Sequence, residues 1–167
     1  MSDFTETVQA KCLAFSDRII KLNDYLLAQA AQAHDEYNNK RRKKNLSSKV
    51  LALSSDSSKF LPLSSSAVPV HMQSVVVLCN QLLRAGTSIG ANNAEATNAI
   101  SKTDYRAKSF IALKEARESL YWIDLLHRNN YIDDKQYNSI YADCEELVKI
   151  LVTRCKKINE DLEKKDK

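Results

Sequence analysis

The segment Gly86-Thr87-Ser88-Ile89-Gly90 has the Gly-x-Ser-x-Gly spacing of a nucleophilic serine. In hydrolases that use this motif, the serine sits on a sharp turn between a strand and a helix, which exposes its hydroxyl. Here the flanking residues repeat apolar side chains at helical spacing, and no strand-like run precedes them. The motif therefore predicts the interior of a helix, and no catalytic residue is assigned.

Asp124 and His127 have the carboxylate-x-x-His spacing that helical bundles use to hold metal ions. A di-iron site needs a second such pair and two further inward carboxylates, and the sequence has no second pair. His127 is better interpreted as a residue near a helix end, where positive charge is favourable. With only two glycines there is no phosphate-binding loop. We expect a protein that is not an enzyme and that has no metal or cofactor.

The four cysteines lack the spacing of metal or redox motifs, and each falls on an otherwise apolar helix face. They are Cys12, Cys79, Cys144 and Cys155. No signal peptide is evident, because Asp3 and Glu6 precede any apolar stretch, and no apolar run is long enough to cross a bilayer. We therefore expect a soluble, cytoplasmic protein with no membrane contact, in which the cysteines are reduced core residues.

Lys40, Arg41, Arg42, Lys43 and Lys44 form the densest positive charge in the chain. The whole sequence carries 25 basic and 21 acidic residues, a net charge of +4 that permits contact with a polyanion. These five residues are the candidate site for RNA or DNA. The alternative is a basic run that caps a helix, because cations stabilise the negative end of the helix dipole.

A second polar set lies among apolar residues of two predicted helices. Its members are Arg84, Asn92, Glu95, Lys114, Glu115, Arg117 and Glu118. Such residues can form a solvated face whose ion pairs contribute only tenths of a kcal/mol. They can also form a polar network between helices or subunits that fixes their register. Both interpretations remain open from the sequence.

These candidate sites lie on or beside four segments with helical periodicity. The first covers about residues 5–40, and its stripe runs from Val8 to Tyr37. The second follows Val75 to Ala96 and is rich in small residues that allow close packing. The third begins at a cap, Ser101 or Thr103, and the fourth follows a capping box formed by Asp133 and Gln136.

Residues 45–69 are rich in serine and contain both prolines of the chain, which oppose a helix there. The simpler interpretation is a flexible surface loop. The alternative is a hairpin or docking peptide, because residues 50–53 and 60–63 are apolar runs that flank a polar turn. The whole chain, residues 1–167, is predicted to form a single all-α domain, an antiparallel four-helix bundle.

Three ordered blocks carry a family resemblance: residues 83–96, 101–105 and 112–122. They closely resemble the bacterial four-helix-bundle family named for proteins encoded in ribosomal-RNA intervening sequences. The resemblance covers about residues 70–158, with a weaker match over the first helix. Ala96 stands where many members have glycine, and the serine-rich stretch replaces a usually short first connection.

The resemblance implies an antiparallel bundle that assembles as a homopentameric barrel. The chain is also similar to the accessory variability protein of diversity-generating retroelements, whose basic barrel surface contacts a reverse transcriptase and its RNA. The leading interpretation is thus an oligomeric accessory protein that binds RNA, a nucleic-acid enzyme such as a reverse transcriptase, or both. The alternative is a protein-binding oligomeric scaffold without nucleic-acid contact, and an enzyme comes last.

Overall fold

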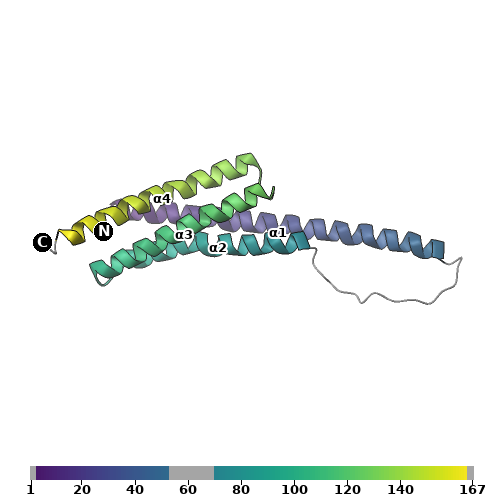
Figure 1. Cartoon of the computed structure of the whole chain (residues 1–167), viewed down its shortest axis with the longest axis horizontal. Coiled ribbons are helices and arrows are strands. Elements are labelled where there is room, and N and C mark those ends of the chain that lie inside the picture. Colours follow the sequence, from purple (N-terminus) through teal and green to yellow (C-terminus); the bar gives the residue numbers. More distant parts are fainter. Residues whose placement is uncertain (1–2, 53–69, 165–167) are drawn as a thin grey trace.

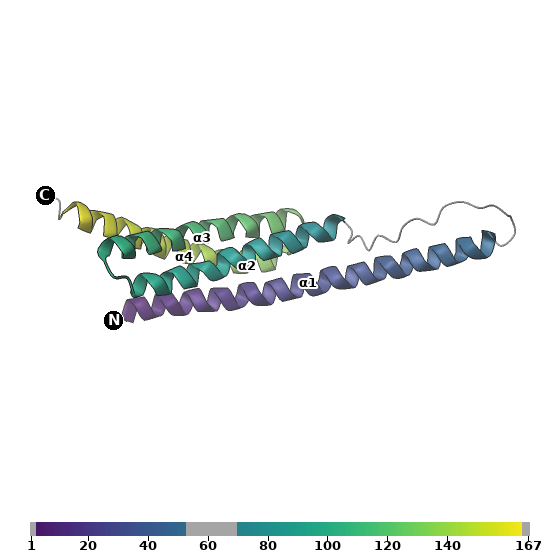
Figure 2. The ribbon, with the colours of Figure 1, turned by 90° about the horizontal axis from the view of Figure 1, so that it is seen from below.

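The computed structural model describes residues 3–52 and 70–164, with side chains for residues 7–44 and 73–164. These residues form four helices. They are α1 (Asp3–Ala52), α2 (Val70–Thr97), α3 (Lys102–Arg128) and α4 (Asp134–Glu163). No described helix is long and apolar enough to cross a membrane. The helices form an antiparallel bundle, in which the N-terminal end of α1 and the C-terminal end of α4 lie at the same end of the bundle (Figures 1 and 2). The predicted all-α, four-helix bundle is confirmed.

Each helix packs beside its neighbours in the chain, and α4 closes the bundle against α1. The apolar stripes predicted from the sequence form a single core. In α2 every residue of the predicted stripe from Val75 to Ala96 is buried. In α4 the stripe residues between Ile140 and Ile158 are buried in the same way, namely Ile140, Cys144, Leu147, Leu151, Cys155 and Ile158. All four cysteines are free and buried, as predicted.

Two helix starts are capped as the sequence predicts. The Ser101 hydroxyl accepts a hydrogen bond from the Asp104 backbone N–H at 3.0 Å, so Ser101 is the N-cap of α3. At α4, the Asp133 side chain accepts from the Gln136 N–H at 2.7 Å, and the Gln136 side chain accepts from the Asp133 N–H at 3.0 Å. This reciprocal pair is the predicted capping box.

Small residues of α2 bring α1 close to it. A Cβ added at Gly86 would lie 3.0 Å from the Ile19 side chain, which is too close for relaxed packing, and one at Gly90 would lie 3.5 Å from Cβ of Cys12. Helix α4 is tied to α1 by charge instead. Lys11 pairs with Glu146 at 2.9 Å, and Arg18 pairs with Asp143.

Helix α1 is longer than predicted, because it continues to Ala52 instead of ending near residue 40 (Figure 2). The basic run therefore lies inside a helix, and its interpretation as a helix-end cap is wrong. The apolar residues Val50–Ala52 are helical, so the first strand of the alternative hairpin is also wrong. Residues 53–69, with the second apolar run at 60–63, lie outside the described residues. The stripe of α1 is buried only as far as Leu26, whereas Ala33 and Tyr37 are exposed.

Candidate nucleic-acid interface and polar network

The five cations from Lys40 to Lys44 are all exposed on α1. Gly86 lies against Ile19, and this antiparallel register places Val70, the first residue of α2, level with Asp35. Beyond Asp35, α1 projects past the other three described helices (Figures 1 and 2). At 1.5 Å per residue, the basic run lies about 8–14 Å past that level. The structure thus presents the predicted cations on an extended rod, away from the acidic side chains that α4 directs at α1.

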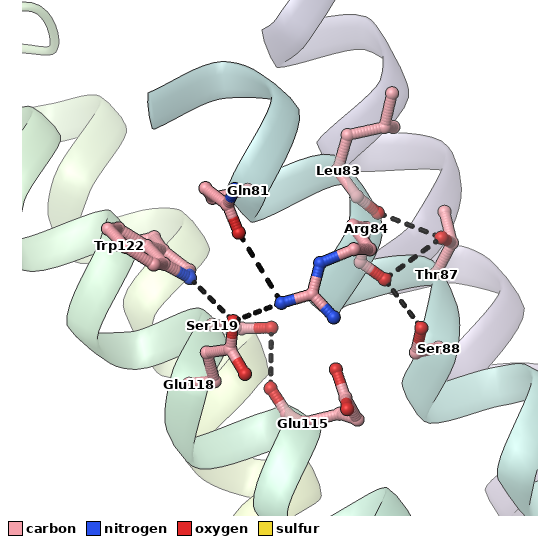
Figure 3. A network of polar contacts seen from close by, with 9 residues as sticks. All are labelled: Gln81, Leu83, Arg84, Thr87, Ser88, Glu115, Glu118, Ser119 and Trp122. Carbon is pink, nitrogen blue, oxygen red and sulfur yellow. Dashed lines mark hydrogen bonds and ion pairs between the residues drawn. The ribbon is translucent and has the colours of Figure 1, made fainter. Parts of the chain in front are cut away.

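The second predicted set is brought together only in part. Arg84 on α2 pairs with Glu118 on α3, with 2.6 Å between Nη2 and Oε1, and the same Oε1 accepts from the Trp122 indole N–H at 3.1 Å (Figure 3). Arg84 also donates to the Gln81 side chain at 3.4 Å. Arg84 and Glu118 thus form a polar contact between α2 and α3.

The other members do not join this link. Glu95 of α2 pairs with Lys108 of α3, a separate polar link between the same two helices that raises the pKa of that lysine through a hydrogen bond and charge attraction. Asn92 donates to the Ser88 carbonyl of its own helix at 2.9 Å. Lys114 and Arg117 are exposed, and neither forms an ion pair with the residues described. They fit the solvated-face alternative.

Glu115 differs from all of these residues. Its Oε2 atom is buried and has no hydrogen-bond partner among the described residues. In Figure 3 the carboxylate lies between α2 and α3, on the same side as Arg84 and Ser88. A buried carboxylate oxygen without a donor costs free energy relative to a hydrogen-bonded one.

Glu118 and Arg117 are neighbours with opposite expected roles. Glu118→Ala removes the acceptor of a half-buried indole N–H and of Arg84, so we expect it to lower the free energy of unfolding by about 1–2 kcal/mol. The ion pair adds little, because it is largely exposed. Arg117→Ala is the matched control and should stay within about 0.5 kcal/mol of wild type. Urea unfolding measures both values, and equal losses in the two variants would contradict this assignment.

One polar chain in the core was not predicted. The Arg154 side chain of α4 is 8% exposed, and its Nη1 donates to Asn93 Oδ1 of α2 at 2.6 Å. Asn93 donates in turn to Gln9 Oε1 of α1 at 2.5 Å, and Gln9 donates to the Gly90 carbonyl at 3.4 Å. Asn93 stood in the predicted stripe of α2, and this amide among apolar residues was the signal that the sequence offered.

The remaining chemical candidates are occupied by structural contacts. Ser88 lies inside α2, and its hydroxyl donates to the Arg84 carbonyl at 2.7 Å, so it does not sit on a strand-to-helix turn. His127 contacts Asp134 at 2.7 Å and stacks on Tyr137, with ring centroids 4.2 Å apart. Asp124 accepts from the Tyr137 hydroxyl at 2.9 Å, a bond that raises the pKa of Tyr137 to about 12. Over the described ranges, no three His, Cys, Asp or Glu side chains gather where they could hold a metal ion.

Comparison with known proteins places the chain in a family. The sequence model described as "23S rRNA-intervening sequence protein" matches residues 65–153. A crystal structure from Bacteroides thetaiotaomicron, described as a protein with unknown function from the S23 ribosomal protein family, is 33% identical, with a TM-score of 0.61. That match covers 91% of this chain and 97% of the other. No curated protein matches the chain. Because the family model covers more than half of its length, the chain belongs to the 23S rRNA-intervening sequence protein family.

Proposed function

We propose that this protein is a cytoplasmic, non-enzymatic, oligomeric accessory protein that binds RNA through the projecting basic segment of α1. The observation that carries the proposal is the exposure of five successive cations, Lys40 to Lys44, on a helix that extends beyond the bundle. Lysine and arginine neutralise phosphates and release counterions, which is the main source of affinity for nucleic acids. The family supports an RNA-related role, since its name refers to sequences within ribosomal RNA.

A filter-binding titration against single-stranded RNA at low and moderate salt tests this proposal. We expect the affinity of wild type to fall steeply with salt, because each neutralised phosphate releases counterions. The variant with Lys40, Arg41, Arg42, Lys43 and Lys44 all changed to Gln should bind weakly and with a shallow salt dependence. Equal binding by both proteins would contradict the assignment of this segment, and no binding by either at low salt would contradict RNA binding.

We further propose that the chain assembles with copies of itself as a homopentamer. Several large apolar side chains are exposed on the outer faces of the bundle, namely Leu13 and Ile20 on α1 and Ile111 and Tyr121 on α3. Leu13 and Ile20 are seven residues apart and therefore lie on one face of α1, and an apolar face that neighbouring side chains extend is the kind of surface that makes protein contacts. In a ring of subunits the basic segments would repeat around one rim, and several weak contacts would combine into a useful affinity.

Light scattering with the whole protein tests the assembly. We expect a mass several times that of one chain, which falls to the monomer mass when Ile20 and Tyr121 are both changed to Ser. Since these side chains are exposed in the single chain, the change should leave its helicity intact. A monodisperse monomer for wild type at micromolar concentration would contradict the proposal.

The second candidate function is a protein-binding oligomeric scaffold without nucleic-acid contact, and the same exposed apolar residues favour it. A nucleic-acid enzyme such as a reverse transcriptase is a partner that would unite the two functions, since it would bring RNA and protein to one assembly. Retention of protein partners by the variant with all five cations replaced would favour the scaffold.

A further inference from the structure

The projecting part of α1 has a definite arrangement of side chains around its axis. Successive residues of a helix are about 100° apart, so five consecutive cations surround the axis completely. With Arg41 taken as the centre of one face, Arg42 points about 100° to one side and Lys40 about 100° to the other, while Lys43 points away. Lys44 lies on the same flank as Lys40. The basic run is thus positive on both flanks and on its back, whereas Asp35 and Glu36, one to two turns earlier, place negative charge on the Arg42 flank and on the back.

The central face carries a different kind of chemistry. His34, Tyr37 and Asn38 lie within about 60° of Arg41, one or two turns before it. Tyr37 is 51% exposed, and the Asn38 amide lies 3.1 Å from a ring nitrogen of His34. Aromatic rings and guanidinium groups stack on unpaired bases, and amides hydrogen-bond to base edges. Side chains of this kind contact bases, whereas the flanking cations Lys40 and Arg42 suit phosphates.

A flat nucleic-acid surface cannot use this arrangement, because Lys40 and Arg42 point in opposite directions. A groove with a phosphate backbone on each wall can contact both residues at once. A helix with its side chains is about 10–12 Å wide, and the major groove of regular A-form RNA is too narrow to admit it. A bulge or internal loop opens that groove and also supplies the unpaired bases that the central face suits.

The described helices leave this part of α1 uncovered. Asp35 is level with the first residue of α2, so Tyr37 and the residues after it lie beyond that helix. From Tyr37 to Lys44 the helix advances by about 10 Å, enough to cross the phosphates bordering a groove. In both views of the molecule, no other described helix flanks this part of α1 (Figures 1 and 2).

We propose that residues 34–44 of α1 lie in the groove of a bulged RNA helix, with Tyr37 and Arg41 facing unpaired bases and Lys40 and Arg42 facing the two phosphate backbones. This proposal rests on the proposed RNA binding and adds the class of RNA recognised. With these contacts the protein would select a duplex interrupted by a bulge, whereas charge attraction alone would not distinguish one RNA from another.

The test uses the full chain with three probes: an RNA hairpin containing a bulge, the same hairpin fully paired, and single-stranded oligouridine. Wild type should bind the bulged hairpin about tenfold more tightly than the paired one, the loss expected for one stacked base. Tyr37→Ala should abolish that preference, and Tyr37→Phe should restore it, because phenylalanine keeps the stacking face. Circular dichroism confirms that each variant keeps its helicity.

Single charge variants test the two walls of the groove. Lys40→Gln and Arg42→Gln should each weaken binding to the bulged hairpin and lower the slope of log affinity against log salt by about one. Lys43→Gln is the matched control on the back of the helix and should have a smaller effect on both quantities. The proposal is overturned if Arg42→Gln binds the bulged hairpin like wild type while Lys40→Gln does not. It is also overturned if Lys43→Gln binds that hairpin as weakly as Lys40→Gln or Arg42→Gln, or if oligouridine is bound most tightly of the three probes. Failure of wild type to bind any probe would instead remove the proposed RNA binding itself.

Discussion

Asn93→Ala is expected to lower the free energy of unfolding by about 3 kcal/mol, because it leaves the buried Arg154 guanidinium without its acceptor. The charge of Arg154 is almost fully buried, and Asn93 Oδ1 is 2.6 Å from its Nη1 atom. The same change also removes the donor to Gln9. A hydrogen bond to a charged group contributes about 1.5–3 kcal/mol, and the unsatisfied buried charge adds a desolvation cost.

The adjacent asparagine provides the control. Asn92 is partly exposed and bonds only to the backbone of its own helix, so Asn92→Ala should cost less than about 1 kcal/mol. Arg154→Met combined with Asn93→Leu should recover much of the loss, since it removes the buried charge together with its partner. Urea unfolding compares the four proteins. Equal stability of the Asn92 and Asn93 variants would show that the buried chain contributes nothing.

Alkaline pH is expected to destabilise the protein through its buried cysteines. Burial raises the pKa of Cys144 from 9.0 to about 12 and that of Cys12 to about 11, while the Cys144 thiol donates to the Ala116 carbonyl at 3.3 Å. Above pH 9 an unfolded thiol ionises while the folded one keeps its proton. The folded state then binds more protons than the unfolded state, so stability is complete below pH 9 and falls as the pH rises toward 12.

Each unit of pH in this range should cost about 1.4 kcal/mol for Cys144 alone, and Cys12 and Cys79 add to this cost up to their own folded pKa of about 11. A total of several kcal/mol is a large part of the stability of a small domain. Melting temperatures measured from neutral to alkaline pH test this expectation. Cys144→Ala lacks the thiol with the highest folded pKa and should show a shallower fall, although its melting point at neutral pH is expected to be lower. Parallel curves for the two proteins would contradict the role of Cys144.

The sequence was sufficient to predict the bundle, because its core depends on local periodicity. The repeat of three or four residues that makes the stripe of α2 from Val75 to Ala96 is local, and the capping box at Asp133 lies within one turn of helix. Both features are present in the structure. The end of α1 was mispredicted for the opposite reason. The apolar repeat in the sequence ends at Tyr37, and the described side chains of α1 from Leu27 to Lys44 are not buried, so no repeat marked the helix where Lys40 to Lys44 and the serines begin.

The candidate site was predicted less completely, because it depends on the register between helices. In the sequence, Lys114, Arg117 and Glu118 are grouped only because all three are charged. The register between α2 and α3 determines that Glu118 is the residue that contacts Arg84. The contact between Arg154 and Asn93 joins α2 and α4, which do not pack directly side by side. No local pattern specifies a contact of that kind.

Recovery of RNA with the protein from its native host is the decisive experiment for RNA binding. The protein is purified by affinity after crosslinking, in parallel with the variant in which Lys40, Arg41, Arg42, Lys43 and Lys44 are all Gln, and the bound RNA is sequenced. We expect wild type to enrich a defined set of RNAs that contain interrupted duplexes, and we expect the variant not to enrich them. Recovery of equal amounts of the same RNA with both proteins, or of proteins without RNA, would contradict this expectation.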